Sequence, residues 1–279
     1  MDRETPDGLS DAERRFKLPA GTFPFQSRFL RVSGATLHYI DEGAGQALFM
    51  VHGNPTWSFV YRHLIQALRA DFRCIAIDLP GFGMSEPPEG FGYTPAEHAA
   101  IVAAALRALD VNDAWLIAHD WGGPIGLAAM FAEPGRLTGI CLGNTWAWPV
   151  NGDVHFEWFS RLIGGPIGRF FNERNAMFVN WVMPAAMRRR KLTLVEMTAY
   201  RAPFDPPRLR APLHIFPRQI TAAQDWLANL ETRLTAYRGP AVLIWPANDI
   251  AFRMKELDRW KKLLPQAQSV IIERCGHYL

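Results

Sequence analysis

Residues 115–126 are Trp115-Leu116-Ile117-Ala118-His119-Asp120-Trp121-Gly122-Gly123-Pro124-Ile125-Gly126. Four apolar residues lead into a polar turn and a helix-like run follows, which predicts a buried strand, a tight turn and a helix. Ala118 and Gly122 stand two positions on either side of Asp120, and small side chains there leave room for a strained turn. An aspartate at the centre predicts attack by a carboxylate on a saturated carbon, whereas a serine would predict acyl transfer. The competing interpretation is a plain turn without chemistry.

The composition is that of a folded protein with a sizeable core. The chain has 279 residues, of which 49% are apolar and 20% are charged. Its 30 basic and 27 acidic residues give a formal net charge of +3, which is too mild to favour nucleic-acid binding. The densest basic run, Arg188-Arg189-Arg190-Lys191, is interpreted as a solvated helix face, with a membrane or partner patch as the alternative.

Cysteine usage and the N-terminal residues bear on location. Cys74, Cys141 and Cys275 are odd in number and lack metal-ligand spacing, which favours reduced thiols. Residues 1–5 lack the apolar core of a signal peptide, and no apolar run is long enough to span a membrane. We therefore expect a cytoplasmic protein without stable membrane association, and the sequence does not indicate its oligomeric state.

Short apolar runs alternate with helical patterns along most of the chain. The predicted strands are an antiparallel hairpin within 31–43, followed by 47–51, 74–77, 115–118, 139–142, 241–245 and 269–272. Continuous apolar strands that alternate with helices predict a mostly parallel sheet covered on both faces. Capping boxes at Thr94–Glu97 and Thr221–Gln224 predict two helix starts.

This alternation stops between residues 147 and 211, where aromatic-rich helical stretches replace the strands. We predict a helical cap at 147–213, inserted after the sixth strand, between core segments 1–146 and 214–279. An insertion at the carboxyl ends of parallel strands covers the place where such folds bind ligands, so an apolar cap implies an apolar substrate. Most cap aromatics should form the cap's own core. The candidate substrate-binding residues are Trp148, Phe156, Phe159, Phe178 and Trp181.

Polar residues that follow the predicted strands are candidates for catalysis. Asp120, Asp249 and His277 each follow a strand, in the order nucleophile, acid, histidine. Asp249 has the alternative role of a turn residue, and His277 that of a buried core histidine. Asp78 is interpreted as structural, and Ser85 lacks the strand–turn–helix context of a serine nucleophile.

Asn54 and Trp121 complete the predicted site. Backbone N–H groups after Asp120 and in the His52-Gly53-Asn54 loop should form an oxyanion hole. The Asn54 amide and the Trp121 indole add two neutral donors, which suit a large, weakly hydrated anion such as bromide or chloride. The alternative is that the Trp121 indole only packs against its neighbours and binds no anion.

These motifs resemble those of haloalkane dehalogenases, which have the α/β-hydrolase fold. The resemblance covers the chain from about residue 25 and is carried by His52-Gly53-Asn54-Pro55-Thr56-Trp57-Ser58-Phe59, Pro80-Gly81-Phe82-Gly83-Met84-Ser85, His119-Asp120-Trp121-Gly122-Gly123 and Phe216-Pro217-Arg218. Family members continue past the histidine into a helix, whereas this sequence stops at Leu279, so we expect His277 to be less firmly held.

The resemblance implies hydrolysis of carbon–halogen bonds through an alkyl ester on Asp120, with halide as a product and with no metal or organic cofactor. Three alternatives remain. β-Lactone decarboxylases of a similar branch use the same nucleophile and fold. Epoxide hydrolases of this fold use two lid tyrosines, whereas this cap offers only Tyr200 because Tyr237 lies outside it. A binding protein without catalysis is the third.

Overall fold

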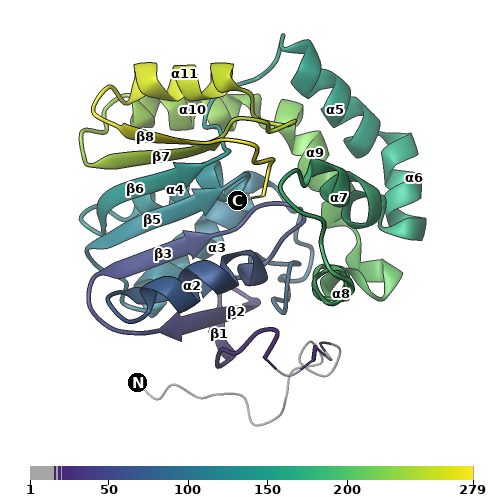
Figure 1. Cartoon of the computed structure of the whole chain (residues 1–279), viewed down its shortest axis with the longest axis horizontal. Helices are drawn as coiled ribbons and strands as arrows, with labels where there is room; N and C mark the ends of the chain where they lie inside the picture. Colours follow the sequence, from purple (N-terminus) through teal and green to yellow (C-terminus); the bar gives the residue numbers. More distant parts are fainter. Residues whose placement is uncertain (1–15, 17, 20, 279) are drawn as a thin grey trace.

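The computed structural model describes residues 16, 18, 19 and 21–278. Its centre is an eight-stranded sheet with the order β1-β2-β4-β3-β5-β6-β7-β8 (Figure 1). The strands are β1 (Arg28–Val32), β2 (Ala35–Glu42), β3 (Ala47–Val51), β4 (Arg73–Ile77), β5 (Ala114–His119), β6 (Leu137–Gly143), β7 (Ala241–Pro246) and β8 (Gln268–Ile272). β2 pairs antiparallel with both of its neighbours, β1 and β4, and β3 to β8 run parallel to one another. The sheet and its edge hairpin are therefore confirmed.

Helices surround the sheet and follow the strands in alternation. Those of the core are η1 (Ser58–Tyr61), α2 (Arg62–Leu68), α3 (Pro95–Ala108), α4 (Gly122–Ala132), α10 (Gln224–Leu234) and α11 (Met254–Leu263). Every residue of β3 is buried, as expected of a strand with both faces covered. The predicted capping box is present at α3, where Thr94 accepts from the Glu97 N–H.

The remaining helices lie between β6 and β7 in the chain. They are α5 (Val154–Gly164), α6 (Pro166–Asn175), η2 (Phe178–Val182), α7 (Met183–Ala186), α8 (Leu194–Arg201), η3 (Ala202–Phe204), η4 (Pro207–Leu209) and α9 (Pro212–Ala222). Figure 1 shows them grouped beyond the carboxyl ends of the strands. We call α5–α8 the cap helices. α9 packs on α5 and extends to Ala222, so it crosses the predicted boundary between cap and core at residue 213. That boundary stays a prediction.

The capping box predicted at Thr221–Gln224 is wrong. Thr221 lies in the last turn of α9, and α10 begins after Ala223 without a side-chain cap. A proline at the start of α9 and a second inside it, Pro217, make a helix there look improbable from propensity alone, yet Leu213, Phe216 and Ile220 are buried. Burial of this apolar face outweighs the weak local signal. None of the described helices is both long and apolar enough to cross a bilayer.

Candidate active site

Asp120 occupies a strained turn between β5 and α4. Its φ of +53° is unusual for a residue with a side chain. Its backbone N–H donates to the Asn144 carbonyl at 3.1 Å, and its carbonyl accepts from the Thr145 hydroxyl at 2.6 Å. A Cβ on Gly122 would lie 1.9 Å from the Val51 carbonyl oxygen, so only glycine fits there. The turn is therefore held from two neighbouring strands.

The Asp120 carboxylate is held by backbone N–H groups. The N–H of Asn54 donates to Oδ1 at 2.8 Å, and the N–H of Trp121 also hydrogen-bonds this carboxylate. Burial raises the pKa of Asp120 to about 6, against the opposing charge of His277 and these two hydrogen bonds. At neutral pH the group is therefore an ionised, poorly hydrated carboxylate.

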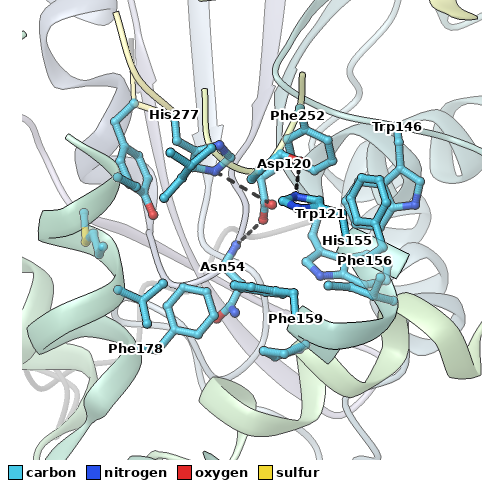
Figure 2. Close-up of a pocket in the computed structure, with 18 residues that line it drawn as sticks. Asn54, Asp120, Trp121, Trp146, His155, Phe156, Phe159, Phe178, Phe252 and His277 are labelled. Atoms are coloured by element: carbon cyan, nitrogen blue, oxygen red, sulfur yellow. Dashed lines mark hydrogen bonds and ion pairs between the residues drawn. The ribbon is translucent and has the colours of Figure 1, made fainter. Parts of the chain in front are cut away.

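One ring nitrogen of His277 lies beside Asp249. The other faces Asp120, as Figure 2 shows. Its Nδ1 lies 2.9 Å from Asp249 Oδ2, and its Nε2 lies 3.9 Å from Asp120 Oδ2. The second distance is too long for a hydrogen bond, so the two groups interact through their charges. Burial lowers the pKa of His277, but the Asp249 charge and hydrogen bond outweigh it and the net shift is upward.

Asp249 is itself fixed by two donors. The N–H of Ala251 donates to Oδ1 at 2.7 Å, and the side-chain amide of Asn144 donates to Oδ2. Burial alone would raise the pKa of this carboxyl, yet His277 and these hydrogen bonds lower it below its usual value. A stable negative charge therefore faces the imidazole and selects the tautomer that carries hydrogen on Nδ1.

His277 is tightly held, contrary to the expectation drawn from the short C-terminal segment. Its side chain is buried, its N–H donates to the Ala186 carbonyl of the cap at 3.1 Å, and its carbonyl lies 2.8 Å from His119 Nε2. Burial lowers the pKa of His119 to about 3, so His119 stays neutral and donates through Nε2. Contacts from the cap and from β5 therefore position His277.

One cavity joins these groups to the cap. Asn54, Asp120, Trp121 and His277 line it on the core side, and Phe156, Phe159 and Phe178 line it on the cap side (Figure 2). Apart from the groups at the nucleophile, most of the lining is apolar, including Trp146, Val182, Met183 and Phe252. The cavity therefore suits a small apolar molecule held against Asp120.

Two predicted substrate-binding residues are not among the residues that line this cavity. Trp148 is buried, and its ring packs against Trp260 of α11 at 5.1 Å between centroids. Trp181 is 55% exposed and contacts Phe171 on the outer side of the cap. The cavity therefore lacks both predicted residues. Trp148 lies in the loop before α5, and aromatic composition does not determine which side of η2 faces inward.

The sequence-based prediction missed two cavity residues with polar side chains, His155 and Tyr278. His155 of α5 reaches the Ala251 carbonyl at 3.3 Å and so contacts the loop that carries Asp249. Tyr278 directly follows His277, and its ring packs against that imidazole at 4.8 Å. Its position directly after His277, a predicted catalytic residue, was the available signal.

Comparison with known proteins agrees with this geometry. Residues 46–279 match the family described as the alpha/beta hydrolase fold. The chain therefore belongs to the α/β-hydrolase fold family.

Individual relatives identify the family of this chain within the α/β-hydrolases. The chain is 38% identical over 260 residues to haloalkane dehalogenase 2 of Mycobacterium tuberculosis, which covers 92% of this chain and 90% of that protein. It is 32% identical to a cis-3-alkyl-4-alkyloxetan-2-one decarboxylase of Shewanella oneidensis, over 92% of this chain and 84% of that one. The solved structure of haloalkane dehalogenase DbeA from Bradyrhizobium elkani superposes with a TM-score of 0.82 at 25% identity, over 91% of this chain and 92% of that one. Within the α/β-hydrolases, the chain is a member of the haloalkane dehalogenase family.

Proposed function

We propose that this protein hydrolyses carbon–halogen bonds of small haloalkanes and releases an alcohol, a halide ion and a proton. The observation that carries the proposal is a largely buried carboxylate, Asp120, with 13% of its side chain exposed, that lines an apolar cavity together with Asn54 and Trp121. A carboxylate stripped of much of its water is a strong nucleophile toward carbon, and neutral N–H donors suit a departing halide.

In the first step, Asp120 Oδ2 attacks the halogen-bearing carbon while the carbon–halogen bond breaks. Oδ1 is held by the Asn54 N–H at 2.8 Å, which leaves Oδ2, the atom nearest His277, to react. The halide leaves toward the side chains of Asn54 and Trp121, and Asp120 becomes an alkyl ester.

In the second step, His277 removes a proton from water, which attacks the ester carbonyl carbon. The bond between that carbon and the alkyl oxygen then breaks, the alcohol leaves with the proton returned by His277, and Asp120 loses a proton to regenerate its carboxylate. The backbone N–H groups that hold the Asp120 carboxylate stabilise the oxyanion that develops there. Esterification removes the negative charge of Asp120, and that charge is one of the causes that raise the pKa of His277. The pKa of His277 therefore falls on alkylation, which makes the imidazole a neutral base when it is needed.

Halide release from a panel of brominated and chlorinated alkanes tests the proposal. Release together with the matching alcohol supports it. No release from any haloalkane, together with carbon dioxide and an alkene from long-chain β-lactones, would instead assign the activity named for the Shewanella relative.

The alkylation rate should fall at acidic pH. Because the pKa of Asp120 lies near 6, its nucleophilic form is lost below that pH, and the rate should drop about tenfold for each further unit. Rapid-mixing measurement of the first equivalent of halide between pH 4.5 and 8 checks this. An alkylation rate that stays constant down to pH 5 would contradict it.

Trp121→Phe should lower kcat/KM by about 10²- to 10³-fold, because it removes one donor to the departing halide while keeping an aromatic ring. The loss should be larger for chloroalkanes than for iodoalkanes, since chloride is the poorer leaving group. Trp148→Phe is the matched control, because Trp148 packs on Trp260 and is not among the cavity-lining residues. Equal losses in the two variants would count against the assigned role of Trp121.

A further inference from the structure

The cap helix α5 is apolar on two sides. Its inner residues Phe156 and Phe159 line the cavity. Its outer residues Val154, Trp158 and Leu162 are 64%, 67% and 56% exposed. Their spacing of four residues aligns them in one row along the helix, which we call the α5 stripe. A helix that is apolar on both sides is normally covered on both.

The apolar surface continues over the next elements. Phe170 and Phe171 of α6 and Trp181 of η2 are exposed and in ring contact with one another, at 5.4 Å for the first pair and 6.3 Å for Phe171 and Trp181. Figure 1 shows α5 and α6 along the outer edge of the cap. A monomer rarely exposes this many large apolar side chains together, and such patches mark interaction sites.

The composition of this surface indicates a protein partner. Residues 154–182 contain arginine, including Arg161 and Arg174, but no lysine. The Arg174 guanidinium lies 5.2 Å from the centre of the Phe170 ring. Tryptophan, phenylalanine and arginine are enriched at protein–protein interfaces, where lysine is depleted.

The charged residues beside the α5 stripe indicate which protein binds this surface. Glu157 and Arg161 each precede a stripe residue, so they lie on the same flank one turn apart, with 3.6 Å between their charged atoms. We propose that two copies of this protein pair through their α5 stripes, with the two helices antiparallel about a two-fold axis. That arrangement places Glu157 of one copy beside Arg161 of the other, twice, around a row of Trp158, Val154 and Leu162.

Sedimentation equilibrium of the full chain tests the pairing independently of enzyme activity. The parent should be a dimer, and Trp158→Glu with Leu162→Glu should be a monomer with an unchanged circular dichroism melting curve. Val270→Glu is the matched control, because Val270 is a 53% exposed apolar residue on β8, and this variant should stay dimeric. A monomeric parent, or a dimer that only Val270→Glu dissociates, would overturn the proposal.

Charge exchange tests the orientation of the helices. Glu157→Arg alone should raise the dissociation constant at least about tenfold, because it sets like charges against each other across the axis. Adding Arg161→Glu to that variant should restore pairing. A double variant that stays as weak as the single one would overturn the antiparallel arrangement. Parent protein that remains monomeric and co-sediments with phosphatidylglycerol vesicles would assign the surface to lipid instead.

Discussion

Replacement of Asp120 by asparagine should abolish halide release, with kcat/KM lower by about 10⁴- to 10⁶-fold. The amide has no negative oxygen to attack carbon, and its NH₂ would meet one of the backbone donors that now hold the carboxylate. Halide release under single-turnover conditions is the measurement, because it reports alkylation directly. Asp120→Ala serves as a second variant that removes the whole functional group.

A stability measurement separates this loss of activity from unfolding. Because burial raises the folded-state pKa of Asp120 to about 6, the folded chain binds this proton more tightly than the unfolded chain does. The free energy of unfolding that this group contributes is therefore highest below the unfolded pKa and decreases as pH rises through about 6. At pH 7 the buried charge costs up to about 3 kcal/mol. Asp120→Asn should thus melt at the same temperature as the parent or higher. A variant that melts well below the parent would show that lost activity reflects lost structure.

Replacement of His277 by phenylalanine should stop the reaction halfway. Asp120 still attacks carbon, since that step needs no base, so one equivalent of halide per protein should appear in a burst. Hydrolysis of the ester should then fall by about 10³-fold or more, because the proton acceptor for water is gone. Intact-protein mass spectrometry should find the parent mass plus the alkyl group, and peptide mapping should place it on Asp120.

His63→Phe is the matched control for that experiment. His63 is exposed on α2, so the same chemical change there should leave steady-state turnover unchanged and trap no adduct. Normal turnover by His277→Phe would remove this histidine from the mechanism. A variant that neither turns over nor releases a burst would place His277 in the alkylation step instead.

Local sequence was sufficient to predict the elbow and the triad. Small residues, Ala118 and Gly122, flank Asp120 in the sequence, and the structure leaves no room for a side chain at Gly122. Asp249 and His277 followed from one rule, that parallel strands place their following loops at one edge of the sheet. The structure brings all three side chains to that edge.

The cap was predictable only as a helical region. Trp148, Phe159 and Trp181 differ little as residue types, yet one packs against α11, one lines the cavity and one is exposed. Trp148 lies in the loop before α5, where no helical period applies. The rotation of each cap helix depends on its contacts with neighbours, and η2 departs from regular α-helical geometry, which shifts the phase of Trp181. Partners distant in the sequence therefore decide these positions, and residue type alone does not.

The amide of Asn144, at the end of β6, donates to the same Asp249 oxygen that holds His277. Two adjacent strands thus end at one anionic position beside the base, and the present chain supplies its carboxylate from β7. Exchange of amide and acid between residues 144 and 249 would keep one negative charge near the imidazole while changing the strand that carries it. If the acid at 249 is replaced first, both positions carry amides and the negative charge beside His277 is lost. If the amide at 144 is replaced first, both positions carry carboxylates that repel each other. Either route passes through an impaired intermediate, and this cost keeps the acid on one strand although both strands end beside the same position.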